Sequence, residues 1–162
     1  MAKEIERKFL LANDTWRAAV IRAVRMSQGY LANNERASVR VRVAGDEASL
    51  NIKGAGLVAV RDEFEYPLPL DDARYLLDTL SAQPLVDKTR HWVAFGGLQW
   101  EIDVFHGDND GLVVAEIELD HPDQAFDRPP WLGSEVTSLH RYYNVNLVAK
   151  PFAAWTDEER NP

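Results

Sequence analysis

The chain of 162 residues contains no cysteine, so neither a disulfide nor a thiolate metal site can form in it. It has no apolar run long enough to span a bilayer, and its first residues lack the apolar core of a signal peptide. Histidine is scarce as well: the four are scattered along the chain, which disfavours a zinc site. We therefore expect a cytoplasmic protein that does not bind a membrane.

Positive charge is also in short supply. The formal net charge of −8 argues against a nucleic-acid partner, because proteins that bind nucleic acid present a basic surface. The composition, 46% apolar and 10% aromatic, is that of a folded globular protein, and the length suits one domain over residues 1–162. Basic residues gather between Arg36 and Arg61, and carboxylates gather between Glu101 and Asp120. The fold must bring these two regions together if they act on one ligand.

Alternation of apolar and polar side chains predicts eight β-strands, because successive side chains of a strand point to opposite faces. The expected strands cover residues 3–10, 27–32, 36–44, 47–54, 60–67, 85–95, 98–107 and 111–120. Apolar residues at helical spacing predict helices over 13–25 and 70–81, and a third helix is expected within 136–148. We expect the tail from Thr156 onward to fray.

Nearly every predicted strand has one apolar face and one charged face. The stretch KEIERKFL places Glu4, Glu6 and Lys8 on one side, and SVRVRV does the same with Arg40 and Arg42. An open sheet with one solvated face would explain the alternation. A closed barrel explains more, because closure removes the edge strands and turns the paired charges inward. We predict an α+β protein with a closed eight-stranded antiparallel β-barrel and helices packed outside it.

Charges inside a barrel are costly unless a ligand compensates them. Arginine and lysine side chains suit phosphate oxygens, and carboxylates are hard ligands for magnesium or manganese. Because carboxylates repel bare phosphate, the mixed signs imply a complex of metal and polyphosphate. The candidate cations are Arg40, Arg42, Lys53, Lys88 and Arg90, and the candidate metal ligands are Glu4, Glu6, Asp103, Glu116 and Glu118.

Between Glu4 and Asn144 the chain resembles the CYTH superfamily, the triphosphate tunnel metalloenzymes, and its short bacterial members above all. The resemblance lies in the ordered motifs EIERKF, QGYL, VRVR, IKG, EFEYPL, KTR, EIDVF, AEIEL and EVTSLHRYYN. It implies a tunnel that binds triphosphate compounds together with a divalent metal.

The resemblance also implies roles for particular residues. Metal would be held by Glu4, Glu6, Asp103, Glu116 and Glu118, with Glu101 as the alternative to Asp103 if the register slips. Phosphate would be contacted by Lys8, Arg40, Arg42, Lys53, Lys88, Arg90 and Arg141. Glu63 and Glu65 match a supporting acidic pair, and Tyr30 beside Lys8 would orient or deprotonate a water.

We therefore predict metal-dependent hydrolysis of inorganic triphosphate to pyrophosphate and phosphate, with two Mg²⁺ or Mn²⁺ ions in each site. Three enzymatic alternatives stay open: a thiamine triphosphatase, a nucleoside triphosphatase and a class IV-type adenylyl cyclase. A binding module that holds polyphosphate without hydrolysing it is the alternative outside catalysis. The expected partner is a small-molecule triphosphate, and the oligomeric state is open, with a homodimer among the alternatives.

Overall fold

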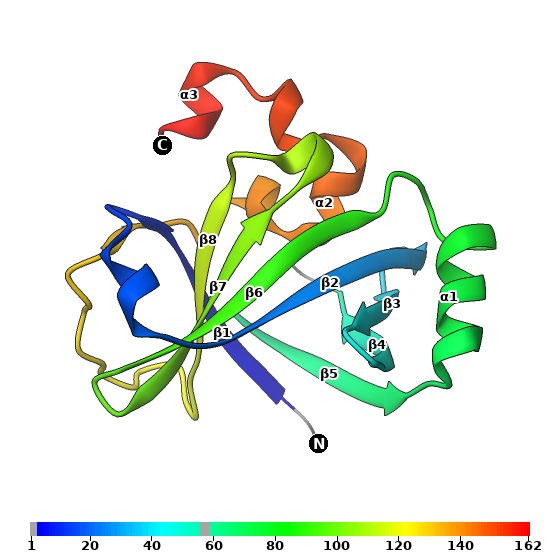
Figure 1. Ribbon diagram of the computed structural model, residues 1–162, viewed down its shortest axis with the longest axis horizontal. Coiled ribbons are helices and arrows are strands. Elements are labelled where there is room, and N and C mark those ends of the chain that lie inside the picture. Colours follow the sequence, from blue (N-terminus) through cyan, green and yellow to red (C-terminus); the bar gives the residue numbers. More distant parts are fainter. Residues whose placement is uncertain (1–2, 56–58) are drawn as a thin grey trace.

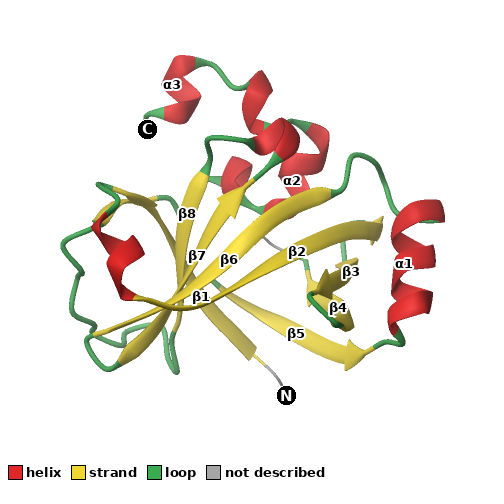
Figure 2. Ribbon diagram, viewed as in Figure 1, coloured by secondary structure: helices red, strands yellow, loops and turns green. Residues whose placement is uncertain are grey.

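The computed structural model describes residues 3–55 and 59–162, and its strands dominate the molecule (Figures 1 and 2). The strands are β1 Lys3–Leu11, β2 Val20–Asn33, β3 Ala37–Ala44, β4 Glu47–Gly54, β5 Val60–Pro67, β6 Val86–Phe95, β7 Leu98–Phe105, β8 Val113–Glu118 and β9 Leu132–Glu135. The α-helices are α1 Leu70–Thr79, α2 Asn144–Ala149 and α3 Asp157–Arg160. Short 3-10 helices lie at Thr15–Ala19, Gly107–Asn109, His140–Tyr142 and Phe152–Ala154. Within the described ranges, no helix has both the length and the apolar character needed to cross a membrane.

Eight of the strands close into an antiparallel barrel, as predicted. Their order is β5-β4-β3-β2-β6-β7-β8-β1, and β1 pairs with β5 to complete the ring. The closing pairs are Lys3 with Asp62, Glu4 with Arg61 and Ile5 with Val60. The ninth strand, β9, lies outside the ring and pairs with the far end of β1.

Most of the apolar core lies outside the barrel wall, because alternation sends the apolar side chains outward. Helix α1 covers β2, β3 and β4, with Ala73 and Leu77 packed against Val41 (Figure 1). A larger cluster is formed by outward-facing residues of β1, β6, β7 and β8 with the 3-10 helix Thr15–Ala19 and the segment that leads into β9. Its members include Phe9, Trp16, Val93, Trp100, Ile102, Ile117 and Trp131.

A third apolar cluster lies where four strands end, and it fills the inner face there. Val86, Phe105 and Val114 continue the same alternation that points Lys88, Asp103 and Glu116 inward. These apolar side chains pack with Tyr142, Leu147 and Trp155 of the C-terminal segment. The inner face of β6, β7 and β8 therefore changes from charged to apolar along the strands.

Three predictions about local structure differ from what the fold contains. The expected helix over residues 13–25 is a 3-10 helix at Thr15–Ala19 followed by the 14-residue strand β2. Its apolar spacing resembled a helix, but residues from Val20 onward pair with β6, and this pairing overrides local propensity.

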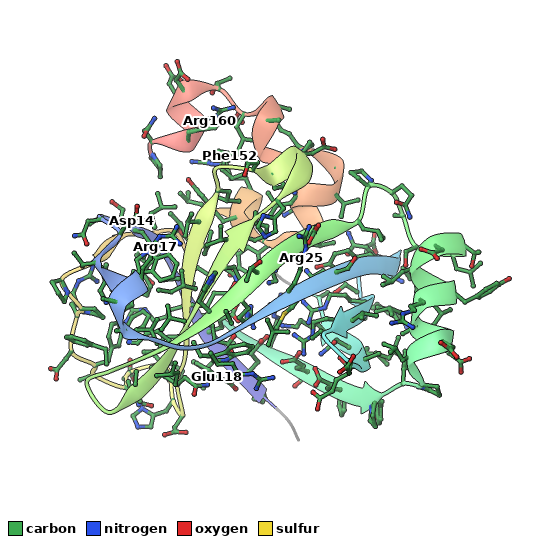
Figure 3. The ribbon with its side chains drawn as sticks, in the orientation of Figure 1. Asp14, Arg17, Arg25, Glu118, Phe152 and Arg160 are labelled. Carbon is green, nitrogen blue, oxygen red and sulfur yellow. The ribbon has the colours of Figure 1, made fainter. Side chains whose placement is uncertain are left out.

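The C-terminal tail, expected to fray, contains helix α3. A capping box between Thr156 and Glu159 begins this helix. Arg160 then donates a hydrogen bond to the Phe152 carbonyl at 3.1 Å, and its guanidinium lies 4.7 Å from the ring centroid of Phe152 (Figure 3). The tail is thus tied to the preceding turn.

The expected helix within residues 136–148 is also divided differently. It consists of a 3-10 turn at His140–Tyr142 and then α2, Asn144–Ala149, with an extended Tyr143 between them. This break matters for the site, because it places the Tyr143 side chain at the barrel interior.

Candidate active site

A cavity of about 630 Å³ runs inside the barrel, and all eight strands of the ring contribute side chains to it. Its lining includes eight carboxylates and six cations, so the formal charges leave an excess of two negative charges. Both signs of charge thus meet in one enclosed space. The carboxylates belong to Glu4, Glu6, Glu35, Glu63, Glu65, Glu101, Glu116 and Glu118, and the cations to Lys8, Arg40, Arg42, Lys53, Arg61 and Arg90.

Most of the residues predicted from the sequence line this cavity. They are Glu4, Glu6, Lys8, Tyr30, Arg40, Arg42, Lys53, Glu63, Glu65, Arg90, Glu116 and Glu118. Three predicted residues are not in the lining: Lys88, Asp103 and Arg141. Lys88 and Asp103 are buried behind it, and Arg141 donates from Nε to the Glu159 carbonyl at 2.9 Å.

Sequence reasoning did not select Arg61 or Tyr143, which the fold brings to the cavity, and it named Glu101 only as the alternative to Asp103. The two-residue period of the strands did mark Arg61 and Glu101. Arg61 shares a strand face with Glu63, and Glu101 shares one with Asp103. No periodic signal marks Tyr143, which follows a 3-10 turn. Its ring centroid lies 5.0 Å from Lys8 Nζ and 5.4 Å from Arg61 Cζ, so the ring lies near two cations.

Arg90 is the cation of the lining with the most carboxylate partners, because its guanidinium contacts three carboxylates. Its Nη2 lies 2.8 Å from Glu116 Oε2 and 2.8 Å from Asp103 Oδ2, and its Nη1 contacts Glu101. Burial alone would lower the pKa of Arg90, but Asp103, Glu116 and Glu101 outweigh it and hold the pKa well above its ordinary value.

Lys8 is the second cation with several partners. Its Nζ lies 2.7 Å from Glu6 Oε1 and also contacts Glu116, although the side chain is only 2% exposed. Burial opposes the charge on Lys8, but Glu116 and Glu6 together raise its pKa above the ordinary value. Burial opposes the charge on Glu116 as well, but Lys8, Arg90 and Lys88 hold the pKa of Glu116 well below its usual range.

A third ionic cluster joins β1 to β4 and β5. Lys53 Nζ lies 2.8 Å from Glu4 Oε1 and 3.4 Å from Glu63 Oε1, and Arg61 Nε lies 3.0 Å from Glu4 Oε2. Arg42 is paired with Glu65 at 2.9 Å. These ion pairs fix the side chains of the lining relative to one another.

Three charged residues of the lining, Arg40, Glu118 and Glu35, form no ion pair among the described residues, and Glu35 lies exposed on the turn between β2 and β3. Arg40 is buried, with 8% of its surface exposed, and its Nε has no hydrogen-bond partner within the described ranges. Glu118, labelled in Figure 3, forms no ion pair in the described part of the chain, in contrast to the neighbouring Glu116. Burial raises the pKa of Glu118, and the negative charges of Glu4, Glu6, Glu63 and Glu101 raise it further.

The donors of this cavity fit a hard divalent cation. Carboxylate oxygens are the ligands that Mg²⁺ and Mn²⁺ prefer, and a cation would relieve the repulsion that raises the pKa of Glu118. Within residues 3–55 and 59–162, no group of three acidic or histidine side chains forms a ready-made metal site. Binding would therefore draw together carboxylates that the fold already places around one space.

The sequence model of the CYTH domain family matches residues 2–150. The chain belongs to the CYTH domain family. A relative from Acetivibrio thermocellus named inorganic triphosphatase is 41% identical over 152 residues, which is 94% of this chain and 97% of that protein. An inorganic triphosphatase from Nitrosomonas europaea is 36% identical over 149 residues, covering 90% of this chain and 96% of the relative.

Solved structures support the CYTH fold independently. A crystal structure of an inorganic triphosphatase superposes with a TM-score of 0.66 at 33% identity, covering 91% of this chain and 95% of that one. A protein from Pyrococcus furiosus shares the fold at a TM-score of 0.58 and 16% identity, over 74% of this chain and 80% of that one. Triphosphatases of the CYTH family depend in general on a metal ion.

Proposed function

We propose that this protein hydrolyses inorganic triphosphate to pyrophosphate and phosphate with the help of a divalent metal ion. The observation that carries the proposal is the enclosed lining in which six cations face eight carboxylates. Two relatives named inorganic triphosphatase, each matched over most of its length, support the choice of substrate. Mg²⁺ or Mn²⁺, two ions per site and activity in the cytoplasm stay predictions.

The phosphate chain would be held by the cations of the cavity. Arg40 is the strongest candidate, because its buried guanidinium has no carboxylate partner in the described chain and can give its donors to phosphate oxygens. Lys8, Arg42, Lys53, Arg61 and Arg90 would add donors around it. Cations fixed by ion pairs stabilise the charge that develops on the leaving group at little reorganisation cost.

The metal would be held by carboxylates of the cavity, with Glu4, Glu6, Glu116 and Glu118 as the predicted ligands and Glu101 beside them. A bound divalent ion polarises phosphoryl oxygens and lowers the pKa of a coordinated water. The supporting pair Glu63 and Glu65 lies in the same lining, where Asn51 donates to Glu63 at 3.1 Å and also to Glu65.

Lys8 and Tyr30 would orient the attacking water. Burial raises the pKa of Tyr30, against the opposing charges of Arg40, Arg61 and Lys8, so the phenol stays protonated near neutral pH. Lys8 stays an ammonium because the carboxylates around it raise its pKa. Both groups are therefore hydrogen-bond donors at neutral pH, which suits positioning of the water and of phosphate oxygens better than removal of a proton.

One observation favours a second candidate, a nucleoside triphosphatase. Asn33, Asn34, Asn144 and Asn146 belong to the cavity lining, and side-chain amides of this kind hydrogen-bond nucleobases. The test is the release of phosphate from triphosphate, ATP, thiamine triphosphate and longer polyphosphates, each with Mg²⁺ and with Mn²⁺. We expect triphosphate to have the highest kcat/KM and to yield pyrophosphate and phosphate in equal amounts.

A higher kcat/KM for ATP would replace the proposal with the nucleotide enzyme. Cyclic AMP and pyrophosphate as products of ATP would identify a cyclase. Binding of triphosphate without hydrolysis in either metal would leave the binding module as the function.

A further inference from the structure

The carboxylate of Asp103 is fully engaged by two cations. The residue has no exposed surface, and its Oδ1 accepts a hydrogen bond from Arg90 Nε at 2.8 Å. Its Oδ2 accepts from Arg90 Nη2 at 2.8 Å and from Lys88 Nζ at 2.5 Å. Asp103 is absent from the cavity lining, whereas Glu101, two residues earlier on β7, is part of it.

Lys88 lies on the side of Asp103 that is away from the cavity. It is 1% exposed, and its Nζ is 5.6 Å from the ring centroid of Phe105. The next inward positions on the two strands are Val86 and Phe105, which belong to the apolar cluster under the C-terminal segment. The Lys88–Asp103 pair therefore forms a layer between that apolar cluster and the charged cavity.

Arg90 is the member of this group that reaches the cavity. Asp103 binds its guanidinium at two points, through Nε and Nη2, which fixes the plane of the fork. Glu101 and Glu116 then contact Nη1 and Nη2 from the cavity side. The direction in which Arg90 presents its donors is thus set from behind by Asp103.

We propose that Asp103 is a positioning residue, which orients Arg90 toward the phosphate chain and does not ligate the metal. Glu101 takes the place among the cavity carboxylates that the family resemblance gave to Asp103. Lys88 completes the same support and makes no direct contact with phosphate. The inference deepens the proposed function, because the role of Arg90 depends on a phosphate ligand.

The first test compares Asp103→Asn with Glu118→Gln, since each removes one carboxylate charge and keeps the side-chain shape. Misplacing a reacting or binding group by about 1 Å can cost on the order of 10² in rate, so we expect Asp103→Asn to lower kcat/KM for triphosphate by about that factor. Its affinity for Mn²⁺ without substrate, measured by electron paramagnetic resonance, should equal that of the wild type. Glu118→Gln should weaken Mn²⁺ binding. An equal loss of Mn²⁺ affinity in both variants would overturn the proposal.

The second test asks whether Asp103 acts through Arg90. We expect Asp103→Asn to have little further effect on kcat/KM in an Arg90→Lys background, because contacts within one network are not additive. Losses that simply multiply in the double variant would show that Asp103 acts independently of Arg90.

The third test uses the wild-type protein, so it holds even if Asp103→Asn fails to fold. Crystals soaked in Mn²⁺ and triphosphate should show anomalous peaks next to cavity carboxylates and beyond bonding distance of both Asp103 oxygens. A peak about 2.0–2.2 Å from either oxygen would make Asp103 a ligand. Failure of the proposed function would appear separately, as wild-type protein that does not hydrolyse triphosphate, while the Mn²⁺ positions would still decide the role of Asp103.

Discussion

The charges inside the barrel fall into two groups, those with a protein partner and those without one. Arg90 and Glu116 represent the first group: they contact each other at 2.8 Å, and each has another buried partner. Arg40 and Glu118 represent the second, since neither forms an ion pair among the described residues. Both groups line one cavity, although Glu118 is exposed where Arg40, Arg90 and Glu116 are buried.

This difference separates structural charges from charges that await a ligand. Paired charges have exchanged water for protein partners on folding, so they hold the geometry of the tunnel. The buried charge of Arg40 has no such partner, and the exposed carboxylate of Glu118 is repelled by the other carboxylates of the cavity, so both destabilise the folded chain until something binds them. Arg40 is matched to an anion and Glu118 to a cation, which is the combination that a metal–triphosphate complex offers. The following experiments test the division between the two groups.

The largest effect is expected for the unpaired cation. Arg40→Ala should lower kcat/KM for triphosphate on the order of 10³-fold, the scale found when an arginine that stabilises a phosphoryl-transfer transition state is removed. The melting temperature of this variant should not fall, because Arg40 forms no ion pair in the described structure and its removal leaves no carboxylate without its cation. Phosphate release and thermal unfolding measure the two quantities.

The matched control is Arg25→Ala, on the outside of the same barrel (Figure 3). Arg25 is on β2 and pairs with Asp87 at 2.6 Å, with 68% of its side chain exposed. The Arg25→Ala variant should keep the full activity of the wild type. Equal losses at Arg25 and Arg40 would mean that overall charge, and not the enclosed site, determines activity.

The next largest effect is on stability, at a paired carboxylate. Glu116→Gln leaves Lys8 and Arg90 each without one of their buried partners, and breaking a buried ion pair from one side costs about 3–5 kcal/mol. Urea unfolding of the variant and the wild type measures the change in the free energy of unfolding. A variant as stable as the wild type would show that this pair does not hold the barrel together.

Ligand binding should stabilise the fold by a smaller amount. Triphosphate with Ca²⁺, chosen to limit hydrolysis, should add about 2.7 kcal/mol at a hundredfold excess over its Kd. For a domain of this length, that is a rise of about 5–10 °C in Tm. The rise should be smaller with ATP, nearly absent with phosphate, and lost in Arg40→Ala. A larger rise with ATP than with triphosphate would favour the nucleotide enzyme.

The smallest effect concerns the unpaired carboxylate and pH. Because the folded state raises the pKa of Glu118, its charged form destabilises the protein once the pH exceeds that pKa. Glu118→Gln should therefore melt a few degrees above the wild type at neutral pH. The difference should shrink as the pH falls through the pKa of Glu118, where the wild-type side chain becomes neutral. Melting curves between about pH 4 and pH 8 would show it. A constant difference across this range would contradict the assigned cause.

The charged inner face could be predicted from the sequence, because alternation is a local property of each strand. The pairs Glu4 and Glu6, Arg40 and Arg42, and Glu116 and Glu118 needed only the two-residue period. Closure of the barrel followed from the cost of leaving edges and charges unprotected, and the pairing of β1 with β5 confirms it.

Depth along the barrel could not be predicted in the same way. Alternation puts Lys88 and Asp103 on the inner face, but it does not say whether an inward side chain reaches the cavity or an apolar layer. That depends on the tilt of the strands and on the C-terminal residues Tyr142 and Leu147, which are far away in sequence. The same non-local cause explains β2, where pairing with β6 decided between helix and strand.

The pairing of β1 with β5, the seam that closes the barrel, determines where the barrel opens locally. The described pairing of β1 with β5 consists of three residue pairs, fewer than between any other neighbouring strands of the ring. One of these pairs, Glu4 with Arg61, also forms an ion pair at 3.0 Å that faces the cavity. Local opening starts where stabilising contacts are fewest, so amide hydrogens at this seam should exchange before those elsewhere in the ring. Because Glu4 belongs to both the seam and the cavity lining, filling of the cavity and opening of the barrel are linked, and the exchange rate at residues 3–5 reports whether the tunnel is occupied.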